Sequence, residues 1–472
     1  MSVYKKKNLL RKIKNNIKLI KKVSKLTGWN FVKAKYMMQK AKKQYNVSYR
    51  NYIKWKFYNK TNEEQAIYVK KRIEREARNT YLINKAATLA GWSFKETKDK
   101  MDITHKEYGV SYKHFIKFKF YKNFNIALEE YLIRQEELSG LRKERIEKIG
   151  KETGWPVDKI IAEVNAARKY CQVTYKDYAN FKFYQLTKEE QARFFTYNHN
   201  VKLREKYNLI PYTSYFINKI NFNLLFKNYI GRKWWTNRNT TFEEFNKFVE
   251  GLDVIICKPI NLTQGLGVKK IDLMKTTTNL ELFYQSLLNE PAAIFEELII
   301  QHKDLADIYP HTVNTIRVFS LLDHNKCHIL FAVWRMGVSS DIVDNFHQGG
   351  IMAVVDLKSG EVSSDAFNLD GDRYETHPVT KRTIKGRIIP YWQQCMNMVT
   401  EAAFVMPQVG YIGWDIAIMK DRPILIEGNT APDYALIQLP YAEEKIGMKH
   451  LIEKFLPGDY SEVQAYHNEL LK

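Results

Sequence analysis

The most constraining feature of this chain is a sequence unit that occurs three times in its N-terminal part, at a constant spacing of 63 residues. The dipeptide Gly28-Trp29 recurs as Gly91-Trp92 and as Gly154-Trp155, and the tripeptide at 56–58 recurs at 119–121 and 182–184. No insertion or deletion breaks this register, which indicates a duplicated supersecondary unit. The rest of the chain lacks the period. The sequence therefore predicts a repeat module followed by a different domain.

Length and charge support this division. A chain of 472 residues is long enough for two or three domains. Residues 1–205 hold 48 Lys and Arg against 21 Asp and Glu, a net charge of +27, whereas residues 206–472 have a net charge of −4. We expect a basic helical repeat domain over 1–205, a helical lead-in over 206–250 and a catalytic domain over 251–460. The expected repeat units lie near 18–80, 81–143 and 144–205.

The repeats are predicted to be all-α, because they contain few Gly or Pro residues and have helical apolar spacing. Thr61-x-x-Glu64 and Thr187-x-x-Glu190 are capping-box patterns that open a third helix in their units. Apolar positions that recur are most simply core residues. Lysines that recur have no packing reason to do so, and they predict basic stripes for an anionic polymer or an acidic partner. These lysines are Lys22/Lys85/Lys148, Lys43/Lys106/Lys169 and Lys56/Lys119/Lys182.

Several features narrow the class and location of the protein. The three repeat tryptophans are more simply packing anchors than a platform for sugars or bases. Nucleic acid is disfavoured as a partner, because no helix-turn-helix, zinc-finger or RNA-binding motif is present. Four widely separated cysteines and the lack of an 18-residue apolar stretch favour a cytoplasmic protein. A basic amphipathic start leaves contact with the inner face of a membrane as an alternative.

The second half alternates strands and helices, and its first motif is a strand that ends in a lysine. Val254–Pro259 is an apolar run containing Lys258, and it is followed by a loop with Gln264, Gly265 and Gly267. A strand-end lysine presents a point charge to phosphate oxygens, and glycines let backbone amides approach them. This pattern indicates a phosphate-binding hairpin.

A second hairpin carries three oxygen ligands. We expect Asp415 at the start of one strand, and Glu427 and Asn429 two residues apart near the end of the next. Residues i and i+2 of a strand face the same side, so the last two side chains project together. Two carboxylates and an amide oxygen suit Mg²⁺ that bridges nucleotide phosphates. We expect a magnesium site on this hairpin.

Other strands add charged residues to this set. A strand over 293–299 runs into an acidic pair that we expect to be exposed, Glu296 and Glu297. Two further strands display Arg317 and Arg335. They are followed by the segment Asn345-x-x-x-Gly349-Gly350.

Taken in order, these motifs resemble the ATP-grasp superfamily, and most closely its sugar-transfer-associated branch, over about 208–440. The segment from Asn345 also resembles the matching part of the ribosomal-protein glutamate ligases. The resemblance implies an α+β protein whose ATP-grasp fold has two α+β subdomains, with ATP and Mg²⁺ as cofactors. It implies that Lys258 and the loop from Gln264 to Gly267 contact the phosphates, with Lys219 as a second nucleotide lysine.

The resemblance also implies roles for the remaining residues. Glu296, Glu297 and Ile299 would form the adenine hinge, and Gln301 and Asp304 are both candidates for the ribose contact. Arg317 and Arg335 would neutralise transferred phosphate or an oxyanion, with Asn345 in the substrate segment. The magnesium ligands would be Asp415, Glu427 and Asn429.

The implied reaction is ATP-dependent ligation of a carboxylate to an amine through an acylphosphate. Three functions remain open from the sequence. The first is a ligase in cell-surface polysaccharide or glycoconjugate synthesis, acting on substrates such as an amino acid and a sugar and recruited by the basic repeats. The second is a ligase that modifies a peptide or an acidic protein. The third is a non-catalytic nucleotide-binding scaffold, which the intact lysine, arginine and magnesium motifs disfavour.

Overall fold

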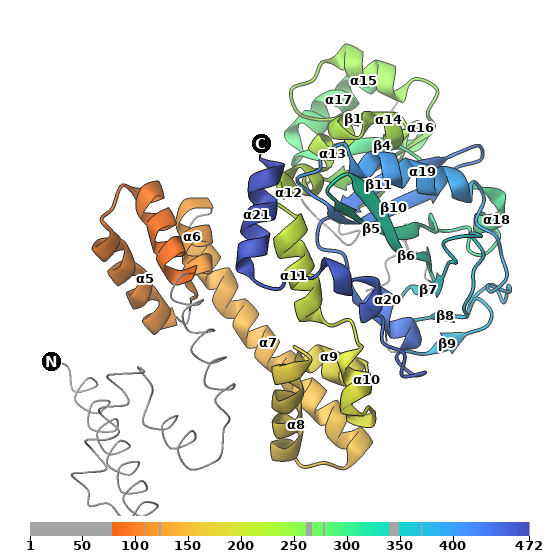
Figure 1. Cartoon of the computed structure of the whole chain (residues 1–472). Coiled ribbons are helices and arrows are strands. Elements are labelled where there is room, and N and C mark those ends of the chain that lie inside the picture. The colour runs from red at the N-terminus through yellow and green to blue at the C-terminus, as the bar shows by residue number, and fades with distance from the viewer. Residues whose placement is uncertain are drawn as a thin grey trace, which may run out of the picture. The chain divides into compact units, whose positions relative to one another are not determined.

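The computed structural model describes residues 78–108, 110–121, 124–260, 267–276, 279–338, 349–369 and 371–471 (Figure 1). The chain forms two compact units, residues 1–139 and 140–472. The first repeat copy, with Trp29 and Lys43, lies outside the described residues. Among the described residues, none of the helices has the length and apolar character needed to cross a bilayer. The four cysteines are free thiols.

In the first unit the described residues are helical. They form a helix over 78–90, then α5 (Phe94–Tyr108), α6 (Tyr112–Tyr121) and the first part of α7 (Phe124–Thr153). A small apolar core of this unit comprises Ile83, Ala86, Met101, Val110, Phe115 and Ile116. They come from the three helices between 78 and 121 and, for Val110, from the connection between α5 and α6.

The second and third repeat copies have helices at equivalent places. α5 and α8 (Val157–Tyr170) begin 63 residues apart, as do α6 and α9 (Tyr175–Asn180). Gly91 and Gly154 follow their helices with φ of +67° and +69°, a left-handed conformation that glycine adopts without strain. Trp92 and Trp155 are half-buried against apolar cores, which supports the packing role. The three-copy repeat itself stays a prediction, because the first copy is not described.

The second unit continues with short helices that lead to two sheets. The capping box of Thr187 and Glu190 opens α10, as the sequence predicts. These elements are η1 (Phe183–Gln185), α10 (Lys188–Ala192), α11 (Tyr197–Tyr207), α12 (Ile210–Ile217), α13 (Lys219–Leu225) and α14 (Lys227–Ile230). The predicted helical lead-in over 206–250 differs from the structure at one place. It contains the strand β1 (Trp234–Thr236), which pairs with a strand of the first sheet.

The smaller sheet has the strand order β1-β4-β2-β3. It consists of β1, β2 (Val254–Pro259), β3 (Lys269–Asp272) and β4 (Ala293–Glu297), all antiparallel. Helices α15 (Phe242–Val249) and α17 (Leu280–Asn289) cover one face, as Figure 1 shows at the top of this unit, and α16 (Leu273–Thr276) follows β3. The aromatic rings of Trp235, Phe245 and Phe295 form the centre of their core.

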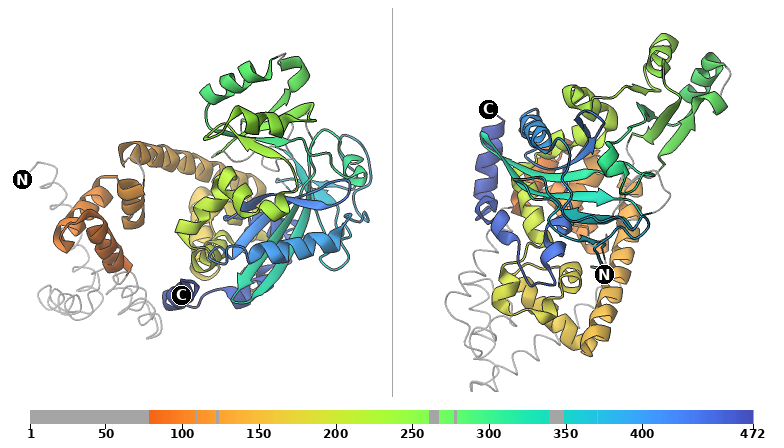
Figure 2. Two further views of the ribbon diagram at one scale, coloured as in Figure 1. Left: turned by 90° about the horizontal axis from the view of Figure 1, so that it is seen from above. Right: turned by 90° about the vertical axis from the view of Figure 1, so that its right-hand side faces the viewer.

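The larger sheet is antiparallel and has seven strands in the order β11-β10-β5-β6-β7-β8-β9. Its strands are β5 (Ile316–Asp323), β6 (Lys326–Met336), β7 (Ile351–Val354), β8 (Ala366–Phe367), β9 (Arg373–Tyr374), β10 (Tyr411–Ile418) and β11 (Pro423–Asn429). The helices around it are α18 (Lys303–Ala306), α19 (Trp392–Ala403), α20 (Ala435–Gln438), η3 (Leu439–Tyr441), η4 (Lys449–Leu451), η5 (Glu453–Phe455) and α21 (Tyr460–Leu470). Figure 2 shows the two sheets from two further directions.

The two faces of the large sheet bury different partners, because side chains alternate along each strand. Val318, Trp334 and Trp414 pack with α19 on one face. Phe319 and Tyr411 pack on the other face with α11, the third repeat copy and the C-terminal helices. The third copy therefore shares one apolar core with the large sheet. The compact unit begins at Gly140, whereas the charge pattern predicts a boundary near 205.

Candidate functional site

A row of charged side chains crosses the large sheet on the face that packs against the third repeat copy. Asp415 lies in the middle strand β10, opposite Arg317 of β5 on one side and Glu427 of β11 on the other. Cross-strand partners face the same side of a sheet, so this register brings the three side chains together. Arg335 of β6 joins them. The sequence predicts all four residues, but it places Asp415 at the start of its strand rather than inside it.

Asp415 is almost completely buried and is bound by both guanidinium groups. Arg317 donates from Nε to Oδ1 at 2.5 Å and from Nη2 to Oδ2 at 2.8 Å. Arg335 donates from Nη1 to both carboxylate oxygens at 3.1 Å. An ionised carboxylate has about four acceptor positions, so these contacts fill them. Although burial opposes ionisation, the two arginines lower the pKa of Asp415 to about 2.

Glu427 has the opposite electrostatic environment. Its pKa is raised, first by burial and then by the negative charge of Asp415, while Arg317 and Lys219 oppose the rise. Asn429 lies two residues further on β11, opposite Gly413 of β10. A pair of carboxylates that repel each other next to an amide oxygen is a donor set that a divalent cation would stabilise. The residues present therefore fit the predicted magnesium site.

Arg335 limits how that site could be used. Because the acceptor positions of Asp415 are filled by guanidinium groups, direct contact of an ion with Asp415 would require Arg335 to release it. Glu427 forms a side-chain hydrogen bond with Asp415, which lowers the pKa of Asp415 and raises the pKa of Glu427. Among the described residues, no group of three or more His, Cys, Asp or Glu side chains is placed to hold a metal ion. The site thus depends on Asn429 for its third oxygen.

A second charged cluster lies on the small sheet. Glu296 of β4 is buried and binds Lys258 of β2, with Nζ 2.6 Å from Oε2. Its Oε1 lies 2.5 Å from Arg232 Nη2 and accepts a bond of 3.2 Å from Asn223 Nδ2. The pKa of Glu296 is lowered because Arg232 and Lys258 outweigh the effect of burial.

This cluster corrects one expectation and adds two residues. The sequence predicts that Glu296 and Glu297 form an exposed pair, but the side chain of Glu296 is only 4% exposed because it neutralises two cations. Arg232 and Asn223 are absent from the predicted site. Arg232 follows Gly231 in a short turn, and no local pattern distinguishes it from a surface arginine.

Lys219 links the two clusters electrostatically. It is the first residue of α13, where Asn218 caps the helix by accepting from the amides of Ile220 and Asn221. Burial lowers the pKa of Lys219, while Glu427 and Glu296 raise it and Lys258 lowers it. Lys219 therefore lies within electrostatic reach of both carboxylate clusters. The role of a second nucleotide lysine, which the resemblance implies for Lys219, stays a prediction.

The chain leaves the small sheet at the predicted adenine hinge. The amide of Glu297 donates to the carbonyl of Lys233 at 2.9 Å, and its side chain accepts from the amide of Lys233 at the same distance. β4 ends there, and Ile299 lies in the irregular segment that follows. The hinge position is thus fixed by bonds to Lys233, and Glu297 also pairs with Ile255 of β2.

Of the two candidates for the ribose contact, Gln301 is committed to the fold. Its Nε2 donates to the carbonyl of Thr312 at 2.6 Å, and its Oε1 accepts from the amide of Asn314 at 3.1 Å. Asp304 is exposed on α18. Gly267 precedes β3 with φ of +73°. The predicted residues Gln264, Gly265 and Asn345 lie outside the described residues.

Comparison with known proteins supports the resemblance for the C-terminal part of the chain. Residues 237–454 match the family described as sugar-transfer associated ATP-grasp. This match confirms the predicted recognition for that segment, which is a little under half of the chain. No curated protein matches the sequence.

Solved structures of ATP-grasp ligases are among those with a similar arrangement. The ATP-grasp ligase PsnB complexed with minimal precursor is 15% identical with a TM-score of 0.31, and the match covers 51% of this chain and 64% of that one. The D-alanine-D-alanine ligase from Coxiella burnetii is 9% identical with a TM-score of 0.33, covering 54% and 60%. D-alanyl-alanine synthetase A from Vibrio cholerae is 11% identical with a TM-score of 0.30, covering 55% and 67%. This chain thus spans 64% of the length of the PsnB structure.

Proposed function

We propose that this protein is an ATP-dependent carboxylate–amine ligase that acts in cell-surface polysaccharide or glycoconjugate synthesis. The observation that carries the proposal is the buried row of Glu427, Asp415, Arg317 and Arg335 on adjacent strands. Structural ion pairs rarely leave a second carboxylate with a raised pKa beside the first, whereas ligand-binding sites often do. The match to a family described as sugar-transfer associated supports the glycan context.

The chemistry starts from a carboxylate, which is a poor electrophile because oxide is a very poor leaving group. Transfer of the γ-phosphoryl group of ATP to the carboxylate gives an acylphosphate and ADP. An amine then attacks the carbonyl carbon, phosphate leaves, and the amine loses a proton. Such a sequence needs charge neutralisation and positioning more than a covalent nucleophile.

The residues of this chain can supply those two requirements. Lys258 and Lys219 are the cations for the nucleotide phosphates, and Glu296 and Glu427 hold them near the site. Arg317 provides fixed donors for an oxyanion, since two bonds to Asp415 orient it, and Arg335 supplies a second cation beside the same carboxylate. Mg²⁺ held by Glu427 and Asn429, and by Asp415 once Arg335 moves, would neutralise phosphate charge when bound. ATP and Mg²⁺ are therefore the cofactors of the proposal.

The basic repeats serve as the recruiting element in this proposal. Lys85, Lys106, Lys148 and Lys169 are exposed at equivalent positions of the second and third copies. Exposed cations at a constant period suit an anionic polymer or an acidic partner with repeating charge. An anionic glycan is the substrate that would account both for these exposed lysines and for the match to a sugar-transfer-associated family.

The test is an ADP-release screen that offers amino acids and other carboxylates together with amine-bearing sugars. ADP release that requires both a carboxylate and an aminosugar would support the proposal. ADP release only with an acidic peptide would instead assign the enzyme to peptide modification. If no substrate pair causes ADP release and the protein does not bind Mg–ATP, the assignment as a ligase would be refuted.

Two variants assign the site within that screen. Asp415→Asn and Glu427→Gln are expected to abolish substrate-dependent ADP release while the fold is retained. Asp421→Asn is the matched control, because Asp421 is an exposed carboxylate at the turn of the same hairpin. Full activity of both site variants would refute the metal and phosphate assignment.

A further inference from the structure

The segment 430–438 follows directly on the strand that carries Glu427 and Asn429, and it lies against the third repeat copy. We propose that the third copy positions this segment over the site, with Asp177 as the positioning residue. The third copy is then not part of a detachable recruiting arm. This inference rests on the proposed function of the site. It assigns a role within catalysis to one copy of the repeat.

The first half of the segment is held by two asparagines. Asn208 at the end of α11 donates to the carbonyl of Thr430 at 2.9 Å and to that of Tyr411 at 2.8 Å. Asn200 of α11 donates to the carbonyl of Pro432 at 3.1 Å and accepts from the hydroxyl of Tyr411 at 2.9 Å. All of these groups are buried or half-buried, so each bond that is lost leaves a polar group without its partner.

The second half of the segment is held by the third copy itself. The hydroxyl of Tyr434 donates to Oδ1 of Asp177, and both side chains are buried. The ring of Tyr434 contacts Phe181 edge-on at a centroid distance of 6.2 Å, and it also contacts Phe195 at 5.8 Å and Tyr197 at 6.0 Å. The aromatic ring thus sits among residues 175–197, with its hydroxyl on the buried carboxyl group of Asp177.

Asp177 has a function that the other copies cannot share. In α9 it forms a capping box with Thr174, since Oδ2 accepts from the Thr174 amide at 2.7 Å and from its hydroxyl at 2.9 Å. At the equivalent positions the second copy has His114 and the first has Asn51. The cap at this third helical position does not require aspartate, because His114 of the second copy makes the same kind of contact, with Nδ1 3.0 Å from Oγ of Ser111. The aspartate of the third copy is explained by its second partner, Tyr434.

The held segment packs beside the charged row. A Cβ atom placed on Gly413 of β10 would lie 2.9 Å from Cβ of Pro432 and 3.1 Å from Cδ of Arg317. Pro432 therefore packs over the strand of Asp415, beside the aliphatic part of the arginine that binds it. Movement of the segment would change the space available to Arg317. A shift of about 1 Å at such a place can cost on the order of a hundredfold in rate.

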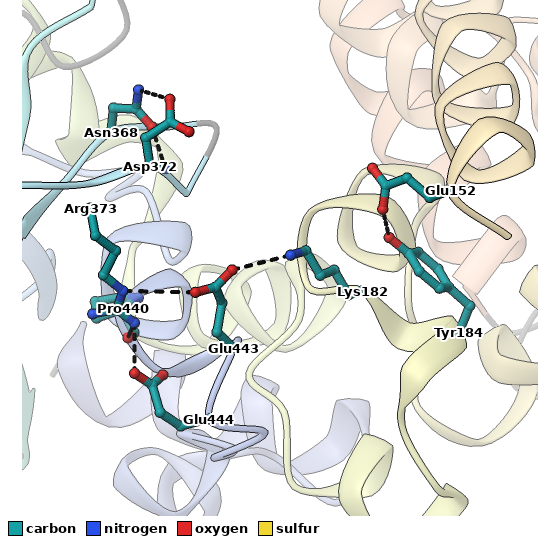
Figure 3. A network of polar contacts seen from close by, with 9 residues as sticks. All are labelled: Glu152, Lys182, Tyr184, Asn368, Asp372, Arg373, Pro440, Glu443 and Glu444. Carbon is teal, nitrogen blue, oxygen red and sulfur yellow. Dashed lines mark hydrogen bonds and ion pairs between the residues drawn. The ribbon is translucent and has the colours of Figure 1, made fainter.

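A second contact joins the third copy to the chain beyond this segment. Nζ of Lys182 lies 3.1 Å from Oε1 of Glu443, whose Oε2 lies 3.9 Å from Nε of Arg373 at the sheet edge (Figure 3). A Cβ atom on Gly447 would lie 2.3 Å from the carbonyl of Arg193, so the two backbones touch there. Exposed ion pairs contribute little, so the close backbone packing and the buried bonds hold this interface. Lys182 is thus an interface residue rather than a member of a free lysine stripe.

The test compares two tyrosines that make the same kind of bond. Tyr434→Phe removes the hydroxyl that Asp177 accepts and keeps the ring. Tyr207→Phe is the matched control, because Tyr207 is fully buried in the same core and donates to Oδ1 of Asp323 at 3.1 Å. Hydrogen–deuterium exchange of the backbone over 427–434 reports the position of the segment without any substrate. Steady-state ADP release and titration with Mg–ATP report the site.

In Tyr434→Phe we expect exchange over 427–434 to become roughly tenfold faster, the effect of losing one buried hydrogen bond. We also expect kcat to fall about tenfold while KM for ATP changes less than about twofold. The reason is that the segment packs beside Arg317, which is proposed to act on the reacting groups, and not beside the lysines proposed to bind ATP. Tyr207→Phe should leave both quantities unchanged at a similar loss of Tm. Unchanged exchange in Tyr434→Phe, or an equal loss of kcat in both variants, would overturn the inference. A wild-type protein that binds no Mg–ATP would refute the proposed function instead, and the exchange comparison would still decide the role of the third copy.

Discussion

Replacement of Glu296 by glutamine is the change whose outcome the structure defines most sharply. The carboxylate lies 2.5 Å from Arg232 Nη2 and 2.6 Å from Lys258 Nζ, and the side chains of Glu296 and Arg232 are 4% and 1% exposed. Glutamine keeps the shape of the side chain but removes its charge. The guanidinium of Arg232 then remains buried with no opposite charge beside it, whereas Lys258, at 18% exposed, can regain water. Breaking a buried ion pair from one side costs about 3–5 kcal/mol.

The measurement is equilibrium unfolding by denaturant of Glu296→Gln against wild type. Glu443→Gln is the control, since Glu443 is half exposed and its ion pairs to Lys182 and Arg373 should add little. Adding Arg232→Met to Glu296→Gln should recover part of the lost stability, because it removes the unpaired cation. A loss below about 1 kcal/mol in the single variant would show that Arg232 finds another partner or water, and the reasoning would fail.

The pH dependence of this effect has a definite sign. The pKa of Glu296 is lower in the folded protein than its ordinary value, because Arg232 and Lys258 stabilise the charged form. Its contribution to stability is therefore complete above the unfolded pKa and is lost as pH falls from that value toward the folded pKa. The difference between wild type and Glu296→Gln should shrink in strong acid.

Three further predictions concern other parts of the molecule. Burial lowers the pKa of His199 to about 4, so stability should fall as pH decreases from about 6.5 to 4, and His199→Gln should flatten that part of the unfolding profile. Gly413→Ala should destabilise the fold by about 1–3 kcal/mol and reduce substrate-dependent ADP release, because its Cβ would press on Pro432; unchanged Tm and activity would contradict that packing. Charge reversal of Lys106 and Lys169 together should weaken retention on an anionic polymer matrix in a salt-sensitive way, and reversal of the exposed Lys303 and Lys358 should not.

The sequence predicts the local parts of the site and misses those that depend on distant contacts. Lys258, Glu427 and Asn429 lie in strand ends whose pattern is visible over a few residues. The pair of Arg232 and Glu296 joins positions 64 apart, and no period or motif in the chain connects them. The local sequence predicts that Glu296 is exposed, because the residues that neutralise it lie elsewhere in the chain.

The boundary of the repeat domain shows the same limit. Charge and periodicity mark the end of the repeats near 205, because both are properties of the sequence alone. The merging of the third copy with the large sheet depends on Asp177, Phe181 and Phe195 meeting Tyr434 across more than 230 positions. A repeated sequence can thus contain copies that differ in what they touch. The period does not reveal that difference.

The bond between Asp177 and Tyr434 also has a consequence for how the chain can vary in length. A unit inserted after the third copy would carry the wrong residue next to Tyr434, as His114 and Asn51 show at the equivalent positions. Units added or removed before it would leave that contact intact. Related chains with more or fewer copies should therefore have gained or lost them from the N-terminal side, with the aspartate-bearing copy always last.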